Sequence, residues 1–279
     1  MNGFILINKT KGVSSNNEVQ KVKKILSVNK VGHLGTLDPI ATGLLILAIN
    51  RATKFSSYLL DSDKSYNTKI KLGISTDTDD STGKILSQMP VNVSLCELKD
   101  NLKSFLGESM QVPPFFSALK HKGKPLYKFA REGKYIEKPS RKINIKNISN
   151  IKLDNDVCSF SIECSKGTYI RSVARDLGNR LECGAHMIAL ERTRQSIFEI
   201  YDAVSASAVN AKNVIPIELA FNEYKKINIS DDEVKKFKNG VQIEFKQLHE
   251  DIYKVYDKNS VFLGLGRIHG GYLKHKQLV

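Results

Sequence analysis

The chain has 279 residues, and its 43 Lys and Arg against 29 Asp and Glu give a formal net charge of +14. This length exceeds that of a typical single domain, and a hydrophobic fraction of 41% can fill a sizeable core. The longest apolar runs are too short to span a bilayer, the N-terminus lacks the pattern of a signal peptide, and the four cysteines show no C-x-x-C spacing. We therefore expect a cytoplasmic protein with buried, reduced thiols and no metal site. Its partner is expected to be a polyanion, nucleic acid in preference to a membrane.

The first part of the chain predicts a mixture of strands and helices. Ser15 followed three residues later by Glu18 forms a capping-box pattern, which predicts the start of a helix. The other elements are expected from apolar runs or alternation: strands over 4–7, 44–49, 66–72 and 157–164, and helices over 95–106 and 168–183. Because these elements do not follow strict βαβ alternation, the predicted fold class is α+β.

The composition changes after about residue 222. Residues 228–239 are mostly polar and charged, and short strand-like pieces then follow, separated by glycines. Short strands with glycine turns predict a small β-rich module. We therefore expect two domains, residues 1–222 and residues 223–279.

The segment GHLGTLDPIATG, residues 32–43, holds one histidine and one carboxylate in a frame of three glycines. Glycine allows backbone conformations and close approaches that a side chain would block, and Pro39 restricts Asp38 to an extended conformation. The apolar strand expected over 44–49 follows at once and would anchor the loop on the core. Asp38 is therefore a candidate reactive group, with an ordinary Asp-Pro turn as the alternative.

With the two leucines that follow, this segment closely resembles the catalytic loop of the TruB family of tRNA pseudouridine synthases, which isomerise uridine 55 in the T arm of tRNA. Further stretches resemble the family in the same order and together cover most of residues 3–195: INKTKGVSS, YLLDSDKSYNTKIKLGISTDTDDSTG, QVPPFFSALKHKGKPLYKFAREG, KGTYIRSVARDLG and GAHMIALERT. The resemblance implies a catalytic domain built on a mixed, mainly antiparallel sheet flanked by helices, and a C-terminal PUA-like RNA-binding module. It also implies isomerisation without a cofactor or metal, on the T-arm stem–loop of tRNA. Nothing in the sequence demands assembly, so we expect a monomer.

The resemblance assigns the start of the reaction to Asp38, either by nucleophilic attack or by assisting proton removal from the sugar; the sequence leaves both routes open. Arg171, in GTYIR, matches the family's active-site arginine facing this aspartate. A fixed guanidinium can hold a carboxylate through two hydrogen bonds, and it is expected to lower the pKa of the acid. By periodicity alone, Arg171 reads as a surface arginine at the start of an amphipathic helix.

Five further residues are assigned to the site. Tyr66 matches the family's catalytic tyrosine and could stack on the displaced base, although by itself it reads as a half-buried strand residue. Tyr169 and Leu190 match positions that contact the uridine, and Leu190 also fits an ordinary core position. The family's counterpart of His33 helps to flip out the nucleotide, with a polar loop histidine as the alternative. Lys9, in the opening motif, is expected to contact RNA.

The segment 113–142 mixes aromatic and basic side chains, and over 120–142 the Lys and Arg residues far outnumber Glu132 and Glu137. Such a mixture suits phosphate and stacking contacts to a folded RNA stem–loop. The resemblance implies a mobile insertion that closes over the T loop. The alternative is a solvated, lysine-rich loop.

Two positions depart from the family pattern: Thr10 stands where proline is usual, and Phe116 where tyrosine is usual. Both affect local RNA contacts rather than the reaction. Residues 77–83 resemble a calcium loop but lack its glycine and its bidentate glutamate, so we interpret them as a polar, acidic turn between strands.

Two rival functions remain. One is a non-catalytic RNA-binding or RNA-folding protein that uses the same basic surface. The other is a pseudouridine synthase of different specificity, such as an rRNA enzyme guided by a small RNA. The short C-terminal module and the absence of long extensions argue against the second.

Overall fold

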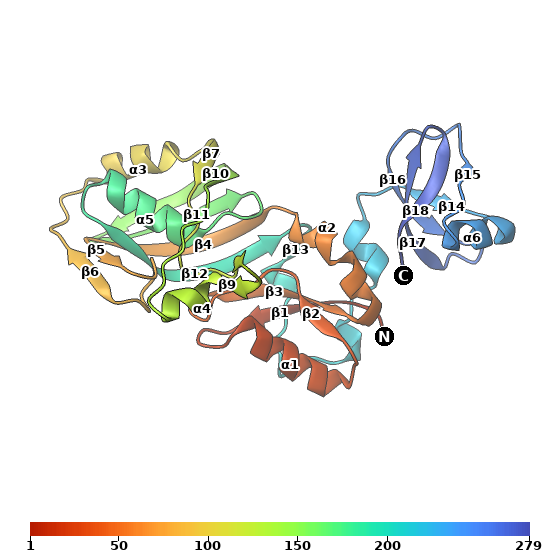
Figure 1. Cartoon of the computed structure of the whole chain (residues 1–279), viewed down its shortest axis with the longest axis horizontal. Helices are drawn as coiled ribbons and strands as arrows, with labels where there is room; N and C mark the ends of the chain where they lie inside the picture. The colour runs from red at the N-terminus through yellow and green to blue at the C-terminus, as the bar shows by residue number, and fades with distance from the viewer.

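The computed structural model describes all 279 residues, as two main β-sheets with helices around them (Figure 1). The larger sheet has nine strands in the order β1-β3-β12-β4-β11-β10-β7, with β2 paired to β3 and β13 paired to β12. Its strands are β1 (Gly3–Lys9), β2 (Val31–His33), β3 (Thr42–Ile49), β4 (Lys64–Leu72), β7 (Gly107–Gln111), β10 (Arg141–Asp154), β11 (Val157–Cys164), β12 (Ala185–Gln195) and β13 (Phe198–Glu199). All pairs are antiparallel except β3 with β12, where Thr42 lies opposite Glu191 and Gly43 opposite Arg192. The predicted mixed, mainly antiparallel sheet of an α+β fold is confirmed.

Side-chain alternation decides which face of this sheet is covered. Along β4, Tyr66, Thr68 and Ile70 are buried, whereas Asn67 and Lys69 between them are exposed. The buried face packs against α5 (Ile170–Arg180) and α3 (Leu95–Lys103), which lie together over this half of the sheet in Figure 1. The opposite face of these strands is polar and open.

Shorter elements complete the larger body and its edges. They are α1 (Ser15–Leu26), α2 (Ser56–Leu60), α4 (Leu126–Arg131), the hairpins β5 (Ile74–Thr76) with β6 (Ile85–Gln88) and β8 (Lys120–His121) with β9 (Lys124–Pro125), and the 3-10 turns at Asn50–Phe55, Ile200–Asp202, Ala211–Asn213 and Ile217–Phe221. No helix among all of these, or in the C-terminal part, has the length and apolar character needed to cross a bilayer.

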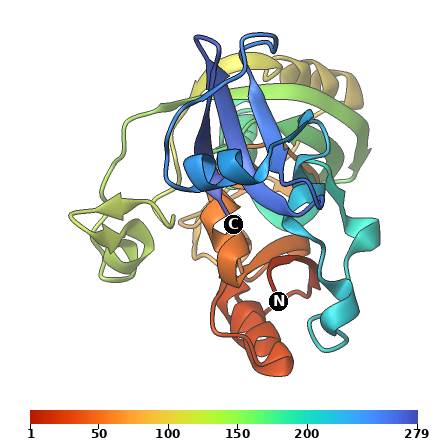
Figure 2. The same cartoon turned by 90° about the vertical axis from the view of Figure 1, so that its right-hand side faces the viewer.

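The C-terminal part forms its own five-stranded sheet, in the order β14-β16-β17-β18-β15, and Figure 2 looks onto this end of the molecule. Its elements are β14 (Lys226–Asn228), α6 (Asp231–Lys238), β15 (Ile243–Glu244), β16 (Ile252–Tyr256), β17 (Phe262–His269) and β18 (Tyr272–Leu278). Leu265 of β17 is fully buried in a cluster with Phe55 and Phe221, so the two sheets share an apolar contact. The predicted β-rich module is confirmed, and α6 was not predicted.

The predicted capping box of Ser15 and Glu18 is wrong, because the N-cap lies one residue earlier. Ser14 is the N-cap of α1, and its hydroxyl accepts a hydrogen bond from the backbone of Asn17. Ser15 is buried instead, and its hydroxyl bonds both the N–H and the C=O of Leu37, at 2.9 Å each. Glu18 is also buried. The start of α1 therefore holds the loop that carries Asp38.

Candidate active site

Asp38 and Arg171 form an ion pair at the centre of the larger domain. Asp38 lies on the loop between β2 and β3, and Arg171 lies in the first turn of α5. The Asp38 Oδ2 atom is 3.0 Å from Arg171 Nε, the arginine side chain is 6% exposed, and the carboxylate is 35% exposed. The predicted proximity of these two residues is therefore present, with the arginine buried and the carboxylate reachable from outside.

Arg171 is fixed by more than Asp38. Its Nη1 donates to the carbonyl of Thr78 at 3.2 Å, and its Nη2 donates to the carbonyl of Phe116 at 2.8 Å. Nη1 also lies 3.7 Å from the buried carboxylate of Asp80. Because its donors face three separate segments, the guanidinium cannot turn away from Asp38 without losing several bonds.

Asp80 belongs to the site, although the sequence placed it only in an acidic turn. That turn is confirmed between β5 and β6, and Asp80 Oδ1 accepts hydrogen bonds from the hydroxyls of Thr78 and Thr82 and from the backbone of Thr82. These bonds aim its other oxygen at Arg171. No local pattern reveals this position, since it depends on the tertiary approach of α5.

Burial raises the pKa of the Asp38 carboxyl above its ordinary value, Asp80 adds to this increase, and Arg171 opposes it. The expectation that Arg171 would lower the pKa holds for its own effect but is wrong for the net shift. Removal of water from around the carboxylate outweighs one favourable charge. A carboxylate with a raised pKa is a stronger base and nucleophile than a solvated one.

A cavity of about 280 Å³ opens directly onto Asp38. Asp38 is the one acidic residue among its lining side chains, and the cavity also brings together four of the residues that the sequence assigned to the site: Tyr66, Tyr169, Arg171 and Leu190. A second cavity of about 660 Å³ meets the first at Asp38 and is lined by His33. Six of the seven predicted site residues therefore surround connected space.

Arg192, which no sequence pattern predicted, lies opposite Tyr66 in the β12–β4 pair and lines the same cavity. Arg192 is 1% exposed; its Nε donates to the carbonyl of Leu44 at 2.7 Å and its Nη2 to that of Gly35 at 3.0 Å. Burial raises the pKa of the Tyr66 hydroxyl, and the charge of Arg192 opposes this. Arginine is rarely fully buried in proteins, so there was no reason in the sequence to place Arg192 in the site. Leu190, two residues earlier on the same strand, was assigned to the site.

Two glycines allow the loop to lie against Arg192. Gly43 has φ +94°, and a Cβ built there would lie 2.4 Å from the Arg192 carbonyl oxygen. Gly35 has φ +114° and faces the Arg192 guanidinium. Both positions need a residue without a side chain, for conformation and for space. These glycines set the close contact of β3 with β12.

Lys9 is fully buried, so the predicted RNA contact is not compatible with its position. Its Nζ donates to the carbonyls of Ala41 at 2.6 Å and Thr10 at 3.0 Å. Burial lowers the pKa of the ammonium, while Glu18 and Asp38 raise it. Lys9 therefore ties down the chain that follows Asp38 instead of facing solvent.

His33 is partly buried at the end of β2, and its Nδ1 atom has no hydrogen-bond partner. Burial and the charge of Arg192 lower the pKa of the imidazole, so the ring is neutral near pH 7. The basic insertion reaches the same cavity, which is lined by Phe116, Tyr127 and Arg131. The neutral His33 ring and basic and aromatic side chains of the insertion therefore line the same larger cavity.

Matches to known proteins agree with this geometry. Residues 23–170 match the family described as TruB family pseudouridylate synthase (N terminal domain), residues 171–218 match the tRNA pseudouridylate synthase B C-terminal domain, and residues 226–279 match Pseudouridine synthase II TruB, C-terminal. The chain belongs to the TruB family of pseudouridylate synthases.

Similar proteins span the whole chain. It is 42% identical to the tRNA pseudouridine synthase B of Clostridium novyi (strain NT), with 100% of both chains covered, and 38% identical to that of Shewanella woodyi, with 100% of this chain and 94% of the other covered. A chain in the crystal structure of a Cbf5-Nop10-Gar1 complex superposes with a TM-score of 0.73 at 23% identity, over 99% of this chain and 84% of the other. A chain of an H/ACA RNP bound to a substrate RNA containing 2′-deoxyuridine gives 0.72 at 22% identity, over 99% and 84%. These two structures share the fold.

Proposed function

We propose that this protein isomerises uridine 55 in the T arm of tRNA to pseudouridine, with Asp38 as its catalytic carboxylate. The observation that carries the proposal is the Asp38–Arg171 pair at the edge of a cavity that also holds Tyr66 and Leu190. The cavity volume lies near the lower end of the range for small-ligand sites, about 300 Å³, which suits one nucleotide turned out of an RNA stack.

The reaction requires one reactive group. The N1–C1′ bond breaks, the uracil turns, and C5 joins C1′; the base then loses its proton at C5 and gains one at N1. No oxidant, reductant or second substrate enters. Asp38 can begin this by attack on C1′ or by taking a proton from the sugar, and its raised pKa supports either role.

The residues around Asp38 would position the carboxylate and bind the displaced nucleotide. Arg171 keeps the carboxylate aimed into the cavity, and Tyr66 and Leu190 hold the uracil by stacking and apolar contact. Tyr169, whose ring lies 5.3 Å from the Arg141 guanidinium, borders the same nucleotide. His33 fills the space that the flipped nucleotide leaves, for which a neutral ring is suited.

The basic insertion and the C-terminal module would hold the rest of the stem–loop. Lys120, Lys122 and Lys128 on the insertion are exposed and form no ion pair, so they are free to bind phosphates. We assign residues 1–222 to catalysis and 223–279 to RNA binding as a PUA-like module. We expect the protein to act as a monomer.

The test uses an unmodified tRNA transcript incubated with the purified protein, followed by chemical mapping of pseudouridine. Product at position 55 supports the proposal. Tight binding without product would favour the RNA-binding alternative, and product elsewhere would contradict the assigned specificity. A variant with Lys120, Lys122 and Lys128 changed to Gln should bind more weakly and with a lower salt dependence.

A further inference from the structure

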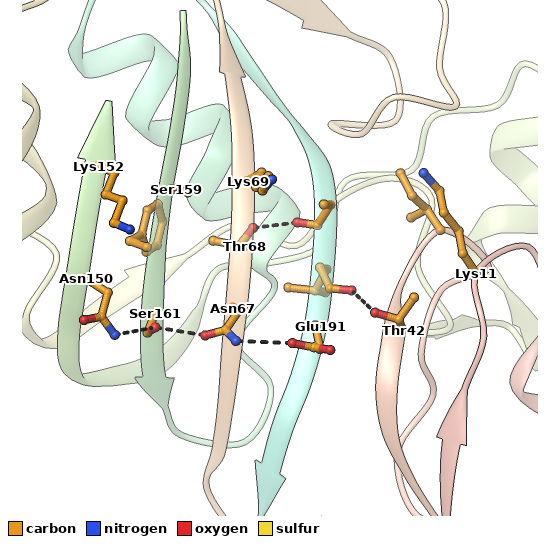
Figure 3. A pocket seen from close by; sticks show the side chains of 14 residues that line it. Lys11, Thr42, Asn67, Thr68, Lys69, Asn150, Lys152, Ser159, Ser161 and Glu191 are labelled. Atoms are coloured by element: carbon orange, nitrogen blue, oxygen red, sulfur yellow. Dashed lines mark hydrogen bonds between the residues drawn. The ribbon is translucent and has the colours of Figure 1, made fainter. Parts of the chain in front are cut away.

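A polar groove lies on the face of the large sheet that no helix covers. Figure 3 views it with α5 behind the strands. The groove has a volume of about 380 Å³ and crosses β10, β11, β4 and β12 before it reaches the turn after β1. Successive residues of a strand point to opposite faces, so Tyr66 faces the uridine cavity while Asn67 faces this groove.

Three lysines border the groove without any carboxylate partner. Lys11, Lys69 and Lys152 are exposed, and none of them forms an ion pair or a side-chain hydrogen bond. Two ion pairs also lie on this face: Glu163 pairs with Arg194 at 2.6 Å, and Asp156 pairs with Lys71. One carboxylate, that of Glu191, remains in the groove, so its net charge is positive.

The groove floor is a hydrogen-bonded ladder of side chains across four strands (Figure 3). Asn150 Nδ2 donates to Ser161 Oγ at 3.1 Å, Ser161 Oγ donates to Asn67 Oδ1 at 2.9 Å, and Asn67 Nδ2 donates to Glu191 Oε2 at 3.2 Å. These hydrogen bonds fix the side chains of the groove floor. One of them also engages an oxygen of Glu191, the only carboxylate in the groove. An antiparallel sheet commonly exposes one polar face to solvent. A solvated face does not require hydrogen bonds between its side chains or unpaired lysines around them, and this groove has both.

The groove continues toward the catalytic loop. Ile40, two residues after Asp38, lines both the groove and the larger cavity around Asp38. Leu190 lines both the groove and the smaller cavity. Ile40 and Leu190 are therefore common to the groove and the cavities around Asp38, so the groove borders the candidate active site.

We propose that this groove is a second RNA-binding surface, which holds the phosphodiester backbone of a tRNA segment outside the T arm. This inference rests on the proposed function. Pockets for small molecules are mostly apolar and enclosed, whereas this groove is polar and shallow and is bordered by ammonium groups. Protein–nucleic acid interfaces have that polar and positive character.

The experiment compares two variants that lose the same three charges. The groove variant changes Lys11, Lys69 and Lys152 to Gln. The control variant changes Lys24, Lys84 and Lys99 to Gln; these are also exposed lysines without ion pairs, but they do not line the groove or the two cavities. Dissociation constants for a full-length unmodified tRNA and for an isolated T-arm stem–loop are measured across a series of KCl concentrations.

The groove variant should bind the full tRNA at least about tenfold more weakly, and its slope of log affinity against log salt should fall by about 2, since about 0.7 counterion is released per contacted phosphate of a single strand. The control variant should change binding less than twofold, and both variants should bind and convert the stem–loop like the wild type. Equal binding of full tRNA by the two variants would overturn the inference, and so would an equal loss on the stem–loop. Failure of the proposed function itself would be recognised separately, because the wild type would then form no pseudouridine in either RNA.

Discussion

The Asp38 carboxylate meets the Arg171 guanidinium at 3.0 Å, and the two residues come from opposite halves of the large sheet. Asp38 precedes β3, whereas Arg171 follows β11, which lies on the other side of the contact between β3 and β12. Only the parallel contact of β3 with β12 joins these halves within the sheet. The ion pair therefore depends on how closely the halves approach, and that approach can be tested separately from the chemistry.

Asp80→Asn should shift the acid limb of kcat/KM to lower pH. Asp38 must be ionised to react, so activity falls as the pH drops through its pKa, and the nearby Asp80 charge is one cause of the raised value. Removing that charge lowers the pKa, while the amide oxygen can still accept bonds from Thr82. The measurement is the pH dependence of kcat/KM. Asp79→Asn is the control, and its acid limb should lie at the same pH as that of the wild type. A limb that stays fixed or moves upward in Asp80→Asn would count against the assignment.

Tyr66→Phe should reduce kcat by at least about tenfold while tRNA affinity stays within about threefold. The ring that we propose to stack on uracil remains, but the hydroxyl near the buried guanidinium of Arg192 is lost, and no hydroxyl faces the base. Tyr66→Leu also removes the ring and should weaken binding. Single-turnover rates and dissociation constants separate the two effects. Unchanged turnover in Tyr66→Phe would leave the hydroxyl without a role.

Gly43→Ala should lower the free energy of unfolding by more than about 3 kcal/mol. A Cβ there combines a φ of +94° with a 2.4 Å approach to the backbone of Arg192, which forces β3 and β12 apart. Gly12→Ala is the matched control, because Gly12 has a similar φ of +86° with nothing within 4 Å. Urea denaturation of both variants isolates the close approach. Equal losses of stability in the two variants would mean that Gly43 is needed for its positive φ and not for its close approach to Arg192.

Asp79→Asn should change the pH dependence of stability in a known direction. Burial raises the pKa of Asp79 to about 6, which Arg175 opposes. A folded pKa above the unfolded value stabilises the fold only at low pH, and this contribution is lost as the pH rises from about 4 through 6. The stability of the wild type minus that of the variant should therefore fall by about 2 kcal/mol between pH 4 and pH 8. Denaturation at several pH values measures it, and a difference independent of pH would contradict it.

Much of the fold could be predicted from the spacing of apolar residues, because a strand or helix that buries one face repeats apolar residues at a fixed interval. The alternation over 66–72 and 157–164 corresponds to β4 and β11, and the helix expected over 168–183 corresponds to α5. Helix α6 was missed because its sequence is mostly charged and only Phe237 is buried. A capping box between Ser230 and Glu233 marks its start, and that signal could have found it.

The site could be predicted in part. The resemblance located Asp38, Tyr66 and Arg171, but it could not give the net direction of the Asp38 pKa, which depends on desolvation in the folded state. Asp80 and Arg192 reach the site only through tertiary contacts, and their local sequence looks ordinary. Lys9 was assigned to RNA through its place in the opening motif, which could not show that backbone carbonyls surround its ammonium group.

Asp38→Asn removes the carboxylate on which the proposed reaction depends. The amide is nearly the same size and can still accept a bond from Arg171, but it is neither a base nor a nucleophile. The measurement is pseudouridine formation in an unmodified tRNA transcript, together with the dissociation constant of the same RNA. We expect the variant to bind the RNA within about tenfold of the wild type, about 1.4 kcal/mol, and to form no product. Product formed at the wild-type rate would contradict it.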